Sequence, residues 1–264
     1  DAEGPAHCAR KVEAEQMKRL PGVAARDGDA LKVALYPYGT ATFTDVNTIS
    51  GGTSYALWDY VHDVLRVAEQ LGWQRFGLLG HSLGAIISVV LAGALPQRVS
   101  RLALIDGVIP PGGDPHDAAE RMGMALQAQL RQGAKGKTVY STLEHAVQAR
   151  MQGMVAVTRA AAELLAQRGV MPVPGGYTWR SDSRLTLPSP LRMSEAQALS
   201  FVRRIACPTQ LVVAEEGMLA RNTALLEQLP FSLKHLPGGH HLHLNDEVGA
   251  SLVADCFNRF FAIP

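Results

Sequence analysis

The stretch Phe76-Gly77-Leu78-Leu79-Gly80-His81-Ser82-Leu83-Gly84-Ala85 decides how this chain folds. It begins with a short apolar run, which is typical of a strand covered on both faces of a parallel sheet. Two glycines then frame Ser82, and the apolar segment Ile86 to Leu95 follows as a buried helix. Glycines leave room for a tight turn between strand and helix that lifts the serine side chain above the strand end. The stretch therefore predicts a nucleophile exposed on a rigid support.

The flanking segments extend this turn into a parallel α/β sheet. Apolar residues recur at helical spacing from Tyr55 to Leu71, and Val99 to Ile105 is a second buried-strand run behind the central helix. Strand, turn, helix and strand in this order form the unit that builds parallel sheets. Two more strands are expected at 208–214 and 231–236, and an amphipathic closing helix at 248–261.

The composition changes after the turn residues Pro110 to Gly113. The following segment is rich in Ala, Gln, Arg and Met, and its apolar residues keep helical spacing over 118–130, 143–151 and 158–168. We expect residues 110–202 to form a helical cap inserted into a core built from residues 1–109 and 203–264. In open α/β sheets ligands bind beyond the carboxyl ends of the strands, so this cap should cover Ser82 and select substrates without performing chemistry.

The overall composition limits the kinds of molecule that we expect this protein to bind. The 264 residues are 47% hydrophobic, which suits one large core with an insertion. Lys and Arg total 25 against 24 acidic residues, and no run of like charge stands out. This balance argues against a nucleic-acid footprint or a polybasic membrane patch, and favours a small, weakly charged ligand.

The cysteine content and the N-terminal stretch of the sequence predict the cellular compartment of the protein. Three scattered cysteines, Cys8, Cys207 and Cys256, are too few for a disulfide framework or a thiolate metal site. No apolar stretch is long enough to span a bilayer, and the N-terminal stretch lacks the order of a signal peptide. We therefore expect a soluble cytoplasmic protein.

Several motifs together resemble a known family, the α/β-hydrolases, and within it the capped, carboxylesterase-like serine hydrolase-like proteins. The similarity runs from about Tyr55 to the end of the chain. Its motifs are Tyr55-Ala56-Leu57-Trp58-Asp59-Tyr60, Gly80-His81-Ser82-Leu83-Gly84-Ala85, Leu104-Ile105-Asp106-Gly107, Trp179-Arg180-Ser181-Asp182-Ser183-Arg184-Leu185 and Pro237-Gly238-Gly239-His240-His241-Leu242-His243-Leu244.

The resemblance implies a catalytic triad in the chain order of this family. Ser82 is the expected nucleophile, and the backbone N–H of Leu83 is the expected oxyanion donor. The general base of the family lies last, on a loop after the final strand, which places it at His240 directly after two glycines.

The triad carboxylate has two candidate positions. The family commonly has an aspartate after the later strand, but Gly217 stands at that place here, with Glu216 before it. The other loop that the family uses follows the earlier strand, where Ile105 runs straight into Asp106. We prefer Asp106 over Glu216, with a purely structural turn role for Asp106 as the remaining reading.

The three histidines His240, His241 and His243 lie within four residues, and imidazole is a common zinc ligand. No carboxylate or cysteine stands at ligand spacing beside them. We therefore expect neither a metal nor another cofactor.

The N-terminal part departs from the family pattern. The family has a Gly-His-Gly motif after an early strand, whose backbone completes the oxyanion hole, whereas this chain has Tyr36-Pro37-Tyr38-Gly39. A strand at 31–36 and a helical stretch at 11–20 are the expected elements before Tyr55. The region is thus predicted to be atypical or incomplete.

Two functions compete at this stage. The first is a serine hydrolase that cleaves a carboxylic ester, or a similar acyl bond, of a small hydrophobic substrate through an acyl-enzyme. The second is a catalytically silent α/β-hydrolase-fold protein that binds a ligand because its oxyanion hole is incomplete. The sequence does not indicate an oligomeric state.

Overall fold

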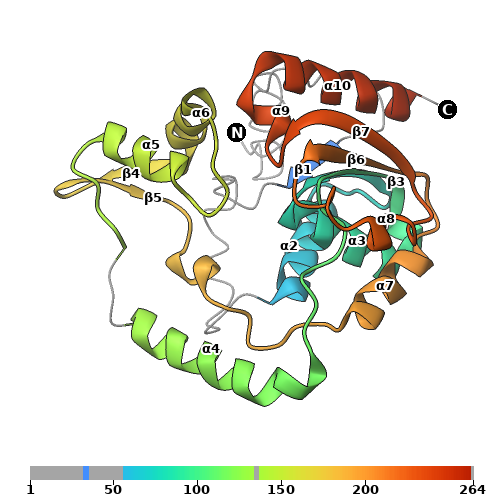
Figure 1. Cartoon of the computed structure of the whole chain (residues 1–264), viewed down its shortest axis with the longest axis horizontal. Coiled ribbons are helices and arrows are strands. Elements are labelled where there is room, and N and C mark those ends of the chain that lie inside the picture. Colours follow the sequence, from blue (N-terminus) through green and yellow to red (C-terminus); the bar gives the residue numbers. More distant parts are fainter. Residues whose placement is uncertain (1–31, 36–55, 134–136, 263–264) are drawn as a thin grey trace, which may run out of the picture.

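A computed structural model describes residues 32–35, 56–133 and 137–262 of the chain (Figure 1). Within these ranges one five-stranded sheet has the strand order β1-β2-β3-β6-β7, and all its neighbouring strands run parallel. The strands are β1 (Lys32–Leu35), β2 (Phe76–His81), β3 (Val99–Ile105), β6 (Thr209–Glu216) and β7 (Ser232–Gly239). This arrangement confirms the predicted parallel α/β core.

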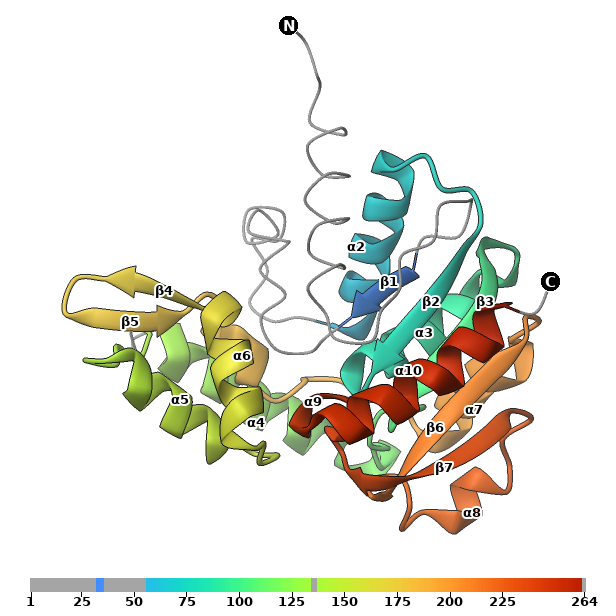
Figure 2. The ribbon, with the colours of Figure 1, turned by 90° about the horizontal axis from the view of Figure 1, so that it is seen from above.

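Helices cover both faces of this sheet (Figure 2). The helices α2 (Leu57–Gln70), α3 (Leu83–Ala94), α7 (Glu195–Arg204) and α8 (Thr223–Leu226) pack on one face, and α9 (Leu242–Asn245) and α10 (Glu247–Ala262) pack on the other. Successive residues of β3 therefore point to opposite faces of the sheet. Leu102 and Leu104 pack in the core under α2, α3, α7 and α8, whereas Ala103 and Ile105 pack in the core under α9 and α10. Because both faces of the sheet are covered by helices, the sequences of its central strands are unbroken apolar runs.

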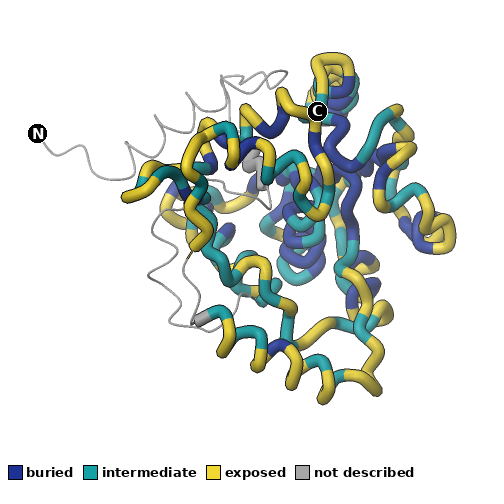
Figure 3. The backbone as a smooth tube through the Cα atoms, turned by 60° about the vertical axis from the view of Figure 1, so that its left-hand side comes forward, coloured by how far each residue is buried: buried dark blue, intermediate teal, exposed yellow. Residues whose placement is uncertain are grey.

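Nine of the twelve residues of the central helix α3 are buried, and the tube coloured by burial shows how much of the chain around it is buried as well (Figure 3). Helix α3 approaches α7 closely at Gly93, where a Cβ atom would lie 2.7 Å from the Cα of Phe201. Leu199 and Val202 of α7 complete the contact. The glycine thus lets two helices that are far apart in the sequence share one core.

The segment between β3 and β6 extends away from the sheet (Figure 1). Its three helices were expected and are α4 (Ala118–Gly133), α5 (Leu143–Met151) and α6 (Arg159–Gly169). It also contains an antiparallel hairpin, β4 (Val170–Val173) with β5 (Gly176–Trp179), which the helical reading of the insertion did not include. Short 3-10 turns occupy Pro96–Arg98, Pro115–Asp117 and Ser183–Thr186.

The division of the chain into core and cap at residues 110 and 202 stays a prediction. The structure adds that α7, which begins inside that range, packs on α3 in the main core. The sequence analysis did not predict the hairpin, because its two four-residue strands are at the lower limit of the length over which alternation can be recognised.

Strand β1 coincides with the strand expected near the N-terminus. The expected helical stretch at 11–20 and the segment Tyr36 to Gly39 lie outside the described residues. Among the helices that are described, none is long and apolar enough to cross a membrane.

Candidate active site

Ser82 sits at the turn between β2 and α3 in a backbone conformation that L-residues seldom adopt. Its φ is 53° and its ψ is −120°, and it caps the N-terminus of α3. The glycines around it make this possible: a Cβ at Gly80 would lie 2.6 Å from the amide nitrogen of Ala85, and one at Gly107 would lie 2.5 Å from the carbonyl oxygen of Ser82. Such strain is found where a fold holds a functional side chain in place.

A continuous chain of hydrogen bonds links Ser82, His240 and Asp106. The Oγ of Ser82 lies 2.8 Å from Nε2 of His240, and Nδ1 of the same ring lies 2.6 Å from Oδ2 of Asp106. The three residues follow β2, β7 and β3, so all stand at the carboxyl ends of parallel strands. The sheet topology therefore brings His240 to Ser82 and Asp106, from which the sequence separates it by more than a hundred residues.

Asp106 is buried and held by the loop after β6. Its carboxylate accepts hydrogen bonds from the backbone N–H groups of Met218, at 2.9 Å, and Leu219, at 3.4 Å. A Cβ at Gly217 would lie 2.6 Å from Oδ1 of Asp106, and closer still to Oδ2. The Asp106 carboxylate thus occupies the space that a side chain at position 217 would need. Glu216, the other candidate acid, is exposed.

The backbone N–H of Leu83 begins α3 beside the serine. It donates no hydrogen bond to any residue that the structure describes, so it is available to a ligand. The positive end of the helix dipole points the same way. The N-terminal loop expected to carry a second donor lies outside the described residues.

Buried histidines surround the serine–histidine pair, and one of them was not singled out from the sequence. Nε2 of His81 donates a hydrogen bond of 2.7 Å to the carbonyl oxygen of His240 and so fixes the backbone of that loop. Burial, followed by the neighbouring histidines, lowers the pKa of His81 well below its ordinary value. Burial also lowers the pKa of His241 to about 4 and that of His243 to about 3. These rings are neutral at pH 7.

Comparisons with known proteins identify the family of this chain. The profile of the α/β hydrolase fold family matches residues 37–246, which is most of the chain. This chain belongs to the α/β-hydrolase fold family. The predicted fold class and the resemblance to serine hydrolase-like proteins are thereby confirmed.

Several curated relatives of this chain are serine hydrolase-like proteins. One from Danio rerio is 27% identical over 219 residues, which cover 77% of this chain and 67% of the relative. One from Dictyostelium discoideum is 28% identical over 206 residues, which cover 71% of this chain and 56% of the relative. The chain therefore spans little more than half the length of the second protein.

Solved structures give the same fold. The crystal structure of a hypothetical protein from Pseudomonas aeruginosa PAO1 is 64% identical, with a TM-score of 0.78 over 81% of this chain and 77% of the other. A thioesterase domain from the curacin biosynthetic pathway, at 24% identity and a TM-score of 0.62, covers 78% of this chain and 74% of its own. At that identity the second likeness concerns the fold alone.

The segment between β3 and β6 is tied to the loop that carries His240. Thr158, at the start of α6, donates from its backbone N–H to Oδ1 of Asn245 at 3.1 Å and from Oγ1 to the carbonyl oxygen of Asn245 at 2.9 Å. Leu244 packs against the apolar cluster inside the insertion. Since α9 begins two residues after His240, these contacts fasten the insertion directly beside the general-base candidate.

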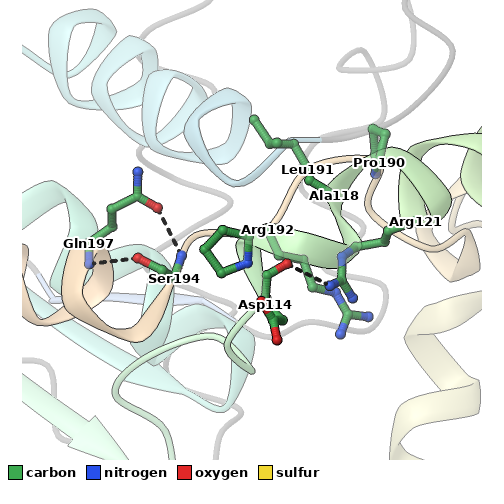
Figure 4. Close-up of a pocket in the computed structure, with 10 residues that line it drawn as sticks. Asp114, Ala118, Arg121, Pro190, Leu191, Arg192, Ser194 and Gln197 are labelled. Atoms are coloured by element: carbon green, nitrogen blue, oxygen red, sulfur yellow. Dashed lines mark hydrogen bonds between the residues drawn. The ribbon is translucent and has the colours of Figure 1, made fainter.

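A separate pocket of about 340 Å³ lies where the two ends of the insertion meet the core (Figure 4). Its lining includes Gly113, Arg121, Pro190, Leu191, Arg192, Ser194 and Gln197. Ser194 and Gln197 hydrogen-bond each other reciprocally, and Arg121 donates to the carbonyl oxygen of Asp114. Ser82, His240 and Asp106 are not among its lining residues, so the pocket is distinct from the hydrogen-bonded triad.

The neutral buried histidines predict a steep loss of stability in mild acid. His241 and His243 have folded-state pKa values of about 4 and about 3, against 6.5 when unfolded. Below pH 6.5 the unfolded state therefore binds more protons, and the free energy of unfolding falls as the pH falls towards 4. Each of these histidines lowers the free energy of unfolding by up to about 1.4 kcal/mol per pH unit, and solvent screening reduces that contribution.

We expect the free energy of unfolding to drop by on the order of 3 kcal/mol between pH 6.5 and pH 5, measured by urea denaturation. The double variant His241→Gln/His243→Gln should show a much shallower pH dependence. An unchanged slope in that variant would show that other groups cause the loss.

Proposed function

We propose that this protein is a serine hydrolase that works through an acyl-enzyme. Ser82 is the nucleophile, His240 the general base, Asp106 the carboxylate that orients the imidazole, and the backbone N–H of Leu83 an oxyanion donor. The observation that supports this most is the unbroken chain of hydrogen bonds from Ser82 Oγ through His240 to Asp106. If these hydrogen bonds had only a structural role, the serine at their end would not need a strained backbone conformation.

The proposed reaction follows from that geometry. As Ser82 Oγ attacks the ester carbonyl carbon, its proton passes to His240 Nε2, and the carbonyl oxygen becomes an oxyanion that accepts from the Leu83 N–H. The C–O bond to the leaving group then breaks, and the alcohol leaves with the proton of His240. Water, deprotonated by the same imidazole, then attacks the acyl carbon. The bond from that carbon to Ser82 Oγ breaks, His240 returns the proton to Oγ, and the carboxylic acid leaves.

A fluorophosphonate probe tests this directly, because it phosphonylates only a serine that is activated by a neighbouring base. We expect stoichiometric labelling of the parent protein and none in Ser82→Ala. Ser88→Ala is the matched control: Ser88 lies on the same helix, but its hydroxyl is buried and donates to the carbonyl oxygen of Gly84 at 2.7 Å. That variant should label like the parent.

Other labelling patterns contradict the proposal. Labelling that persists in Ser82→Ala would place the nucleophile elsewhere. An unlabelled parent protein that is folded would favour a catalytically silent ligand-binding protein.

We propose a small hydrophobic ester as the substrate, because the insertion presents apolar side chains. On α4 the residues Met122, Met124, Leu126 and Leu130 are exposed, and Met154 is exposed between α5 and α6. Such side chains can exclude water and line an acyl pocket. These apolar side chains support a substrate with a weakly polar acyl group. They do not indicate which leaving group the substrate carries.

A series of p-nitrophenyl esters tests the substrate class. We expect kcat/KM to rise by about tenfold or more from acetate to hexanoate, because each buried methylene contributes about 0.8 kcal/mol. Rates that are flat across the series would show that the site holds no apolar acyl pocket.

A further inference from the structure

Four imidazole rings gather around one point of the site, although the proposed reaction uses only one of them. The ring centroid of His81 lies 4.6 Å from that of His240, 5.2 Å from that of His241 and 4.4 Å from that of His243. His81, His240 and His241 are all buried. One nitrogen from each of these three rings lies within 4.8 Å of the nitrogens of the other two.

The hydrogen bonding of His81 suits metal binding. A metal ion binds an imidazole nitrogen that carries a lone pair. The carbonyl oxygen of His240 can only accept a hydrogen bond, so Nε2 of His81 carries the proton and Nδ1 carries the lone pair. His81 therefore offers a donor atom in the form that a metal requires.

The other two rings are also suited to bind an ion. Asp106 lies 2.6 Å from Nδ1 of His240, which is the carboxylate–histidine arrangement that orients metal ligands, and it leaves Nε2 as the donor. Nδ1 of His241 is buried and makes no hydrogen bond to any described residue, while its Nε2 lies 3.5 Å from Nη2 of Arg150. Its ring can thus turn at little cost in hydrogen bonding.

We propose that His81, His240 and His241 form a site for one divalent transition-metal ion of the zinc class. Zinc–nitrogen bonds of about 2.1 Å place tetrahedral ligand nitrogens about 3.4 Å apart, so small ring rotations bring the three onto one ion. Three imidazoles with a buried carboxylate behind one of them select borderline metals such as Zn²⁺ over oxygen-seeking ions such as Mg²⁺.

Occupation of this site excludes the proposed hydrolase chemistry. The metal takes the lone pair of His240 Nε2, which is the pair that accepts the proton of Ser82 in the proposed reaction. Zn²⁺ should therefore act as a reversible inhibitor, not as a cofactor. Metal binding itself does not depend on the proposed function, whereas the inhibition rests on it.

The test measures binding and labelling separately on the full-length chain after treatment with a chelator. Isothermal titration with Zn²⁺ and with Mg²⁺ measures binding, and the visible absorption of bound Co²⁺ reports tetrahedral coordination. His241→Gln removes one proposed ligand and retains Ser82, His240 and Asp106. His235→Gln is the matched control, since it removes an exposed imidazole on β7.

We expect one Zn²⁺ ion to bind the parent and the His235→Gln protein, no Mg²⁺ to bind, and His241→Gln to weaken Zn²⁺ binding by about tenfold or more. Fluorophosphonate labelling should be blocked by Zn²⁺ and restored by chelation, with a correspondingly higher inhibitory concentration in His241→Gln. Equal Zn²⁺ affinity in His241→Gln and the parent would overturn the site. If the parent binds Zn²⁺ through His241 yet never labels, the metal site stands and the hydrolase proposal fails.

Discussion

Asp106→Asn should lower turnover by about 10⁴-fold while leaving the fold intact. When the Asn amide nitrogen faces His240, its oxygen can still accept from the Leu219 N–H, as Oδ1 of Asp106 does at 3.4 Å, so the loop after β6 keeps one of its two anchors. The amide would instead donate to Nδ1 of His240, which moves the ring proton to Nε2. An imidazole in that tautomer cannot accept the proton of Ser82, so the nucleophile is no longer activated.

The measurement is kcat on a p-nitrophenyl ester, together with the rate of fluorophosphonate labelling and the free energy of unfolding. Glu216→Gln is the control, because Glu216 is exposed, and it should retain the parent rate. Full activity in Asp106→Asn together with a large loss in Glu216→Gln would place the triad acid after β6 instead.

Gly217→Ala should cost about a hundredfold in turnover although position 217 makes no contact with substrate in the proposed mechanism. The added Cβ would lie 2.6 Å from Oδ1 of Asp106 and 2.7 Å from Cβ of Ala214. Ala214 belongs to the buried strand β6 and cannot yield, so the Asp106 carboxylate must shift away from His240. A displacement of about 1 Å in a catalytic group is enough for a loss of that size.

Two further variants interpret this result. Gly123→Ala on helix α4 is the control, because a Cβ at Gly123 meets no heavy atom within 4 Å. It should leave turnover unchanged and raise the free energy of unfolding by up to about 1 kcal/mol, because Ala favours a helix interior over Gly. The exchange Asp106→Gly/Gly217→Asp moves the carboxylate to the neighbouring loop and should recover part of the activity that Asp106→Gly alone loses. Parent-like activity in Gly217→Ala would show that the Asp106 position is not critical.

The proximity of positions 106 and 217 also explains why the sequence left two candidates for the triad carboxylate. Asp106 and Gly217 lie on different loops, and only the pairing of β3 with β6 reveals that the carboxylate of one fills the side-chain space of the other. Neither residue type is unusual for a turn taken alone. Their complementarity is a property of strand order, which a linear reading does not contain.

The sequence by itself determined the elbow at Ser82, the strands and helices of the core, and the loop that carries His240. These features are local: an apolar run, a pair of glycines and a periodic helix face each report on residues close together in the chain. The tertiary structure alone decided which carboxylate meets His240 and that His81 joins the later histidines. Both depend on parallel strands that bring residues more than a hundred positions apart to one edge of the sheet, where contact is set by strand order and register.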